Sequence, residues 1–82
     1  TWRANLVAGG PAATAKKLGE EAVEAAIAIA HQSDTEVAAE AADVIYHLLV
    51  ALRSRGVSLD KVGKVLEARQ GKSGIEEKAS RP

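Results

Sequence analysis

The chain has 82 residues, enough for one small domain, and its formal net charge is zero, from 11 basic and 11 acidic residues. This balance lacks the basic excess of general nucleic-acid-binding proteins, so we expect no nucleic-acid partner. Seventeen residues are alanine and none is cysteine, phenylalanine or methionine, which excludes disulfides and leaves only a thin core. We therefore expect a second copy of the chain to complete the fold.

The sequence predicts neither a membrane span nor a signal peptide. It has no run of 18 apolar residues, and it has no charged leader followed by an apolar stretch. The absence of cysteine is typical of a reducing compartment. The expected location is therefore the cytoplasm.

The first half of the chain predicts one long helix after a lead-in segment, residues 1–10. Pro11 suits a first helical turn, because its missing N–H needs no partner there. From 11 to 31, apolar residues recur at steps of three and four, the spacing of one helix face. These residues are Ala15, Leu18, Ala22, Ala25, Ala26 and Ile29.

Two further helices follow, each preceded by a serine suited to its N-terminus. Ser33 begins the capping box S-x-x-E ahead of a helix over 34–55. Ser58 is an N-cap for a third helix, which reaches residue 70, and residues 71–82 form a polar tail. With no alternating strand pattern, the chain is predicted to be a single all-α domain, an antiparallel helical bundle completed by homodimerisation.

Five carboxylates lie among small apolar residues of the first two predicted helices. The spacings E-E-x-x-E and E-x-x-D place each set on one side of its helix, and antiparallel packing can bring the two sets together. Oxygen ligands of this kind suit Mg²⁺, which often completes its shell with substrate phosphates. The predicted metal-binding and catalytic residues are Glu20, Glu21, Glu24, Glu40 and Asp43.

Other interpretations of these residues stay open at this point. The acids can be solvated charges, with Lys16 and Lys17 as ordinary i,i+4 partners on the helix surface. A di-iron site is disfavoured, because neither histidine has a glutamate three residues before it. His47, one turn beyond Asp43, is interpreted as structural, although a contact to the metal ligands is an alternative.

Longer segments resemble a known family. The E-E-x-x-E and E-x-x-D pair is similar to the all-α NTP pyrophosphatases, the MazG-like superfamily. Within it, K-K-L-G-E-E-A-V-E, E-A-A-D-V-I-Y-H-L-L-V and G-K-S-G-I-E-E-K-A-S-R resemble the phosphoribosyl-ATP pyrophosphatase family over nearly the whole chain. Thr1 and Arg3 depart from the usual S-[WY]-T of the family. Family members also carry a helix upstream, so we expect the sequence to be part of a longer chain.

The resemblance implies a Mg²⁺-dependent hydrolysis of phosphoribosyl-ATP to phosphoribosyl-AMP and pyrophosphate, the second step of histidine biosynthesis. It also implies a homodimer with active sites near the subunit interface, and it assigns the metal site to the five carboxylates. Candidates for contacts to substrate phosphates are Lys17, Arg69, Lys72, Lys78 and Arg81. The alternatives are a house-cleaning (d)NTP pyrophosphatase of the same fold and a non-catalytic helical dimerisation module.

Overall fold

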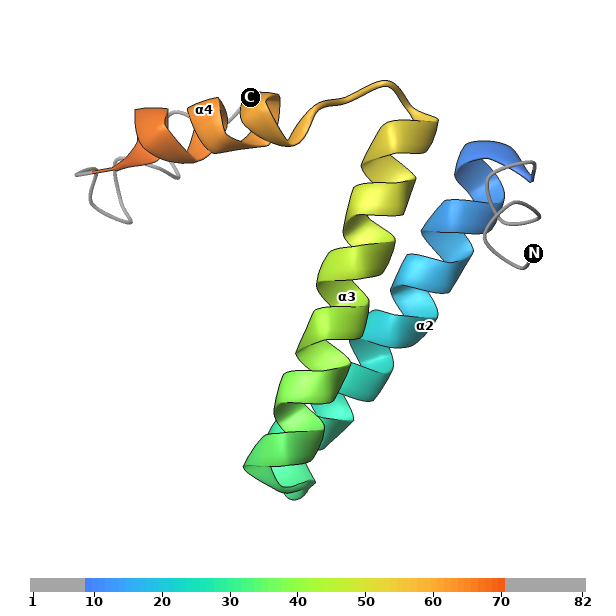
Figure 1. Ribbon diagram of the computed structural model, residues 1–82, viewed down its shortest axis with the longest axis vertical. Helices are drawn as coiled ribbons and strands as arrows, with labels where there is room; N and C mark the ends of the chain where they lie inside the picture. The colour runs from blue at the N-terminus through green and yellow to red at the C-terminus, as the bar shows by residue number, and fades with distance from the viewer. Residues whose placement is uncertain (1–8, 71–82) are drawn as a thin grey trace.

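The structure, a computed structural model, describes residues 9–70 of the chain. In this part the chain forms three helices and no strand, which confirms the predicted all-α class. The helices are α2 (Gly10–His31), α3 (Asp34–Ser54) and α4 (Leu59–Arg69), in this order along the chain (Figure 1). None of the three is long and apolar enough to cross a membrane.

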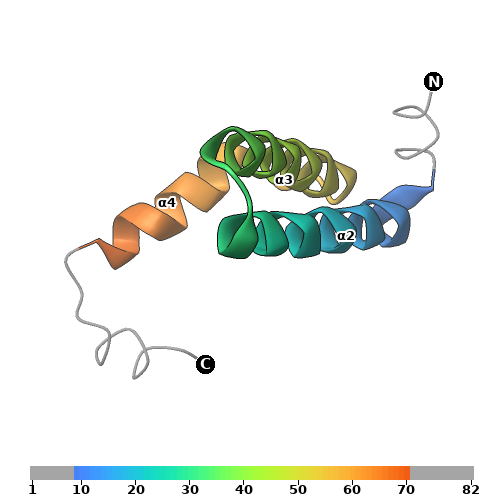
Figure 2. The same cartoon turned by 90° about the horizontal axis from the view of Figure 1, so that it is seen from below.

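α2 and α3 form an antiparallel hairpin and lie side by side along their lengths (Figures 1 and 2). The turn between them needs only two residues, because each helix end is satisfied locally. The N–H of Gln32 donates to the carbonyl of Ala28, which closes α2. The hydroxyl of Ser33 accepts from the N–H of Glu36 and donates to its carboxylate, so the capping residues predicted for α3 do act there.

The open end of the hairpin is joined by two hydroxyl groups. Thr14 in the first turns of α2 is buried, and its Oγ1 lies 3.0 Å from Oγ of Ser54 at the end of α3. Each hydroxyl has a single proton, so one of the two donates to the other across the hairpin, and the other donates to a backbone carbonyl of its own helix, that of Pro11 for Thr14 or that of Ala51 for Ser54. The two helices are thus connected at both ends of the hairpin.

The interface between the helices is built from small and polar side chains. Ala25 and Ala28 are the buried apolar residues of the described chain, and Ala28 is 0% exposed. The other buried residues are polar or charged: Thr14, Glu21 and His47. The apolar stripe expected on α2 is therefore mostly wrong. Ala25 is buried and Leu18 is half-buried, but the other four expected members, Ala15, Ala22, Ala26 and Ile29, are exposed, and the packing face carries polar groups instead.

Large apolar side chains lie on the outside of the hairpin rather than within it. The exposed ones on α2 and α3 are Val23, Ile27, Ile29, Ile45, Leu48 and Leu49. Among the described residues, extensive packing is confined to α2 and α3, and α4 points away from them (Figures 1 and 2). Soluble monomers rarely expose large apolar patches. Within residues 9–70, a single copy of the chain therefore leaves these apolar side chains uncovered.

The direction of α4 is set by the residues that end α3. Gly56 has a φ of +67°, which places it in the left-handed region that favours glycine, and its neighbour Val57 donates to the carbonyl of Leu52. Ser58 then caps α4 by accepting from the N–H of Lys61. This short connection turns the chain sharply away from the hairpin (Figure 1).

Candidate metal centre

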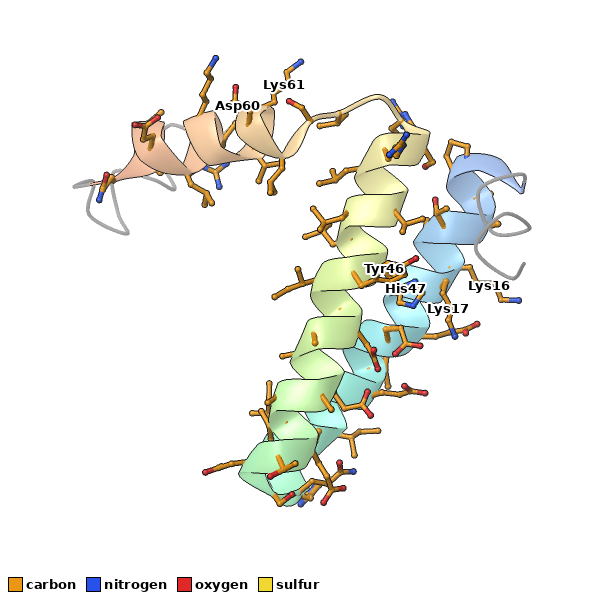
Figure 3. The ribbon with its side chains drawn as sticks, in the orientation of Figure 1. Lys16, Lys17, Tyr46, His47, Asp60 and Lys61 are labelled. Atoms are coloured by element: carbon orange, nitrogen blue, oxygen red, sulfur yellow. The ribbon has the colours of Figure 1, made fainter. Side chains whose placement is uncertain are left out.

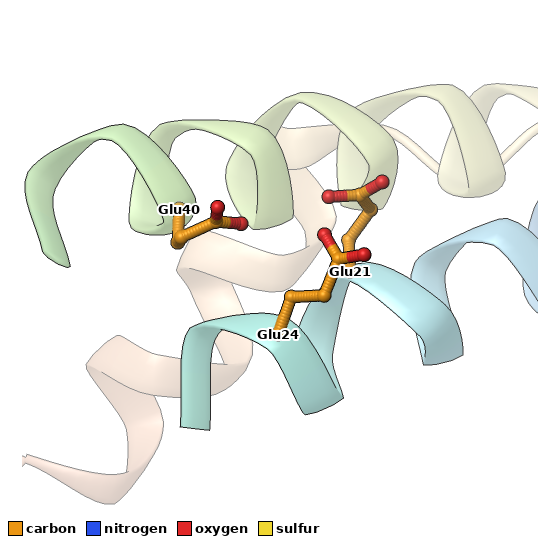
Figure 4. A group of neighbouring side chains, drawn as sticks. All are labelled: Glu21, Glu24 and Glu40. Atoms are coloured by element: carbon orange, nitrogen blue, oxygen red, sulfur yellow. The ribbon is translucent and has the colours of Figure 1, made fainter. Parts of the chain in front are cut away.

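Three carboxylates meet between α2 and α3. Glu21 and Glu24 come from α2 and Glu40 comes from α3, and each offers one oxygen that lies within 4.8 Å of the other two. Figure 4 shows the three side chains turned toward one another across the space between the helices. We call these residues the acidic cluster.

The position of the acidic cluster follows from the face that α2 presents to α3. Glu21 lies one turn before Ala25, which is buried in the helix interface, so its side chain points the same way. Glu21 is itself only 7% exposed. Glu24 follows three residues later and lies at the edge of this face, where it reaches Glu40 of the opposite helix.

Lys17 supplies the nearest positive charge. Its Nζ lies 3.0 Å from Oε1 of Glu21, one helical turn away, and its side chain is 38% exposed. This hydrogen bond, together with the positive charge of Lys17, holds the pKa of the Glu21 carboxyl below its ordinary value. The same contact raises the pKa of Lys17. Both groups are therefore ionised at neutral pH.

Glu24 shows the repulsion within the acidic cluster. The negative charge of Glu21 raises the pKa of the Glu24 carboxyl, and a hydrogen bond between the two carboxyls, partial burial and the charge of Glu40 add to the effect. Lys17 offsets only part of it. The cluster therefore carries more negative charge than residues 9–70 neutralise.

Glu40 provides an independent sign that the cluster suits a cation. Its Oε2 is buried, and among the described residues it has no hydrogen-bond partner. A buried carboxylate oxygen without a donor is costly unless a positive charge compensates it. Oxygens that share an octahedral Mg²⁺ lie about 3–4 Å apart, because each is about 2.1 Å from the ion. The cluster is thus close to the spacing that such an ion requires.

Two of the five predicted carboxylates lie outside the acidic cluster. Glu20 and Asp43 are exposed, and neither belongs to the group whose oxygens approach within 4.8 Å. Glu20 precedes Glu21 by one residue, which turns it by about 100° around the helix. The structure thus brings together three of the predicted site residues and leaves these two toward solvent.

The predicted phosphate-binding residues have different positions. Lys17 lies beside the acidic cluster, as described above. Arg69, at the end of α4, lines an open hollow with Gly63, Leu66, Glu67 and Gln70, so the single chain does not bring it to the cluster. The remaining three, Lys72, Lys78 and Arg81, lie outside the described residues.

His47 is closer to the site than the sequence interpretation suggested. It is 5% exposed and points toward α2 at the level of Lys17 (Figure 3). Its ring makes an edge-to-face contact with that of Tyr46 at 5.1 Å between centroids, and its charge contributes to the lowered pKa of Glu21. The signal for this position is its spacing of seven residues from Glu40, two turns along the same helix face.

Comparison with known proteins agrees with this geometry. The sequence profile of the family described as phosphoribosyl-ATP pyrophosphohydrolase matches residues 1–70, which include all three helices and the acidic cluster. The chain belongs to this family. The profile thus confirms the family resemblance read from the sequence motifs, and no solved structure gives a significant match.

Individual members of the phosphoribosyl-ATP pyrophosphohydrolase family match over nearly the whole chain. The phosphoribosyl-ATP pyrophosphatase of Cereibacter sphaeroides is 56% identical over 81 residues, covering 99% of this chain and 79% of the relative. That of Methylobacterium nodulans is 53% identical over 81 residues, covering 99% and 76%. That of Caulobacter vibrioides is 59% identical over 71 residues, covering 87% of this chain and 66% of the relative.

Proposed function

We propose that this chain performs the reaction for which its family is named, the hydrolysis of phosphoribosyl-ATP to phosphoribosyl-AMP and pyrophosphate in histidine biosynthesis. The observation that supports this most directly is the acidic cluster, formed within the segment that the family profile matches. Its three carboxylates carry more negative charge than the neighbouring Lys17 offsets, and a nucleotide triphosphate chain is normally bound through a divalent cation. The cation proposed here is Mg²⁺.

Glu21, Glu24 and Glu40 would hold this ion. Glu20 and Asp43 stay predicted members of the site, at its exposed side. Bound Mg²⁺ would neutralise charge on the phosphate oxygens and help to orient the attacking water. The protein's part in such a reaction is mainly positioning and electrostatic stabilisation. A carboxylate of the cluster can accept the proton of the water, and Lys17 lies close enough to the cluster to contact a phosphate.

The assay that tests the proposal measures pyrophosphate release from phosphoribosyl-ATP with and without Mg²⁺. We expect turnover that requires the metal and stops when EDTA is added. A panel of dNTPs serves as the comparison, because a house-cleaning pyrophosphatase would hydrolyse these at least as well. Hydrolysis of no nucleotide at all would favour the helical dimerisation module.

We also propose that the active form is a homodimer. The support is the apolar surface of the hairpin, which is large in comparison with a core of two buried alanines. α4 does not cover it, and a second copy of the chain offers an apolar surface of the same kind. In such a dimer, basic residues that lie far from the acidic cluster in one chain could reach that of the partner. The cytoplasmic location stays a prediction.

Ile45→Glu tests the dimer. Ile45 is 59% exposed on the outer face of α3, so a charge there should cost little in a monomer but should oppose association. We expect the variant to sediment as a monomer at concentrations where the wild-type protein is a dimer. Thr35→Glu adds the same charge at an exposed position near the start of α3 and should leave the mass unchanged. Equal sedimentation of all three proteins would contradict the proposed interface.

A further inference from the structure

Lys17 and a divalent cation would depend on the same carboxylate. The Lys17 ammonium lies 3.0 Å from Glu21, the most buried member of the acidic cluster. The Glu21 side chain is 9% exposed, so solvent and salt screen this pair less than an ordinary surface ion pair. A carboxylate that is shared in this way cannot satisfy both cations fully.

We propose that Lys17 is an intramolecular competitor of the metal, which pairs with Glu21 when no ion is bound and releases it when Mg²⁺ binds. Once released, its ammonium group is available to a phosphate oxygen of the nucleotide. Lys17 thereby makes metal binding weaker in the absence of substrate than the three carboxylates alone would make it. This inference rests on the proposed function of the acidic cluster, and it assigns Lys17 a role in setting the metal affinity.

Lys17 should weaken metal binding because its positive charge and that of the cation repel each other when both lie close to the Glu21 carboxylate. A single and a double positive charge a few ångströms apart repel each other even at high dielectric. The glutamates of the cluster in turn act on Lys17, since the charges of Glu21, Glu20 and Glu24 all raise its pKa. Lys17 is therefore coupled to the whole cluster through charge as well as through its direct contact.

Lys16 offers a matched control. It has the same charge and lies in the same helix, but it is exposed, and within residues 9–70 it makes no ion pair. Figure 3 shows its side chain directed away from the hairpin, whereas Lys17 lies at the level of His47. Replacing either lysine by methionine changes the net charge of the protein equally. A difference between the two variants therefore reports position and not total charge.

The first measurement is calorimetric titration of the nucleotide-free protein with Mg²⁺ alone. We expect Lys17→Met to bind Mg²⁺ about three- to tenfold more tightly than the wild type, because one repelling charge has been removed. Lys16→Met should change the Kd by less than about twofold. Lys17→Arg keeps the charge and should bind with nearly the wild-type Kd.

Thermal melting gives a second readout that does not depend on activity. In EDTA, Lys17→Met should melt at a lower temperature than Lys16→Met, because Glu21 has lost its counter-ion. Saturating Mg²⁺ should raise the melting temperature of Lys17→Met more than that of the wild type, since a tighter ligand stabilises the folded state more at a given concentration. With phosphoribosyl-ATP, KM should rise in Lys17→Met but not in Lys16→Met.

The outcomes separate this inference from the proposed function. If the wild type binds Mg²⁺ and hydrolyses phosphoribosyl-ATP, but both methionine variants have the same Kd for Mg²⁺, Lys17 does not compete and the inference is wrong. Tight binding by Lys17→Arg equal to that of Lys17→Met would also overturn it, because charge would then not be the cause. If the wild type neither binds Mg²⁺ nor hydrolyses the nucleotide, the proposed function is wrong, and the inference, which rests on it, is wrong as well.

Discussion

Glu24→Gln should reduce the turnover of phosphoribosyl-ATP by about 100-fold or more, because it removes one anionic ligand from a cluster of three. Glutamine has the same shape as glutamate, so the backbone of α2 should not move. Calorimetry should show weaker binding of Mg²⁺ in parallel. Glu67→Gln, a change of the same kind on the exposed surface of α4, should leave both quantities unchanged.

The same substitution should make the metal-free protein more stable. The pKa of the Glu24 carboxyl is raised above its ordinary value of 4.5, mainly by the negative charge of Glu21, so protonation of Glu24 stabilises the fold. This contribution is complete below pH 4.5 and is lost as the pH rises through the raised pKa. Glutamine stays neutral at every pH. We therefore expect the variant in EDTA to melt about 1–3 °C above the wild type near pH 7 and together with it well below pH 4.5.

Glu24→Gln should lower the turnover but raise the melting temperature of the metal-free protein, and this combination distinguishes loss of a metal ligand from misfolding. Loss of activity through misfolding would lower the melting temperature, whereas loss of a ligand from a repulsive cluster should raise it. A variant that keeps wild-type turnover, or one that is less stable than the wild type in EDTA at pH 7, would contradict the role assigned to Glu24.

Ala28→Leu should destabilise the hairpin by about 1–3 kcal/mol, which is the usual effect of adding methylene groups to a close-packed interface. Ala28 is 0% exposed and lies one turn beyond Glu24 on α2. A larger side chain there must push α2 and α3 apart, which also moves Glu24 away from Glu40. Urea unfolding should show the loss of stability, and Mg²⁺ titration should show weaker binding.

Ala26→Leu is the matched control for this prediction. It makes the same change two residues away on the same helix, at an exposed position. We expect it to change the free energy of unfolding by less than about 0.5 kcal/mol, the usual range for surface positions. If the two leucine variants were equally stable, α2 and α3 would not be packed closely at Ala28.

The ends of the helices could be predicted well, because their signals are local. Ser33 marks the start of α3, and its hydroxyl makes the expected capping contact by accepting from the N–H of Glu36, whereas the Glu36 carboxylate accepts from this hydroxyl. Gly56 ends α3 with a positive φ, and Ser58 caps α4 through its hydroxyl. Each of these residues acts on backbone groups within four positions of itself, so the sequence alone contains the whole interaction.

The packing face of α2 could not be predicted from hydrophobicity. Alanine occurs on all sides of this helix, so the apolar spacing noted in the sequence does not define one face uniquely. The residues that face α3 include Thr14 and Glu21, which a hydrophobic pattern assigns to solvent. Leu18 and Ala25 fit the expected stripe, whereas its other members, Ala15, Ala22, Ala26 and Ile29, are exposed.

Because the packing face of α2 could not be predicted, the sequence also did not show which carboxylates of α2 point toward α3. Neighbouring residues on a helix differ by about 100° in direction, so E-E-x-x-E cannot by itself tell whether Glu20 or Glu21 points at the opposite helix. Only the packing of α2 on α3 decides this, and it turns Glu21 inward. The pairing of Lys17 with a buried acid, rather than with a surface one, depends on the same rotation.

The contact between Thr14 and Ser54 has a mechanical consequence. Helix ends usually fray, and when two helices are connected only at their turn they can separate at the opposite end. Here the contact between Thr14 and Ser54 joins the helices at the open end of the hairpin, and the turn at Gln32 and Ser33 joins them at the other end. The acidic cluster lies between these two fixed points, so the separation of its carboxylates is buffered against motion at either end. A hairpin with a small apolar core can thereby hold the carboxylates of the acidic cluster at a nearly constant separation.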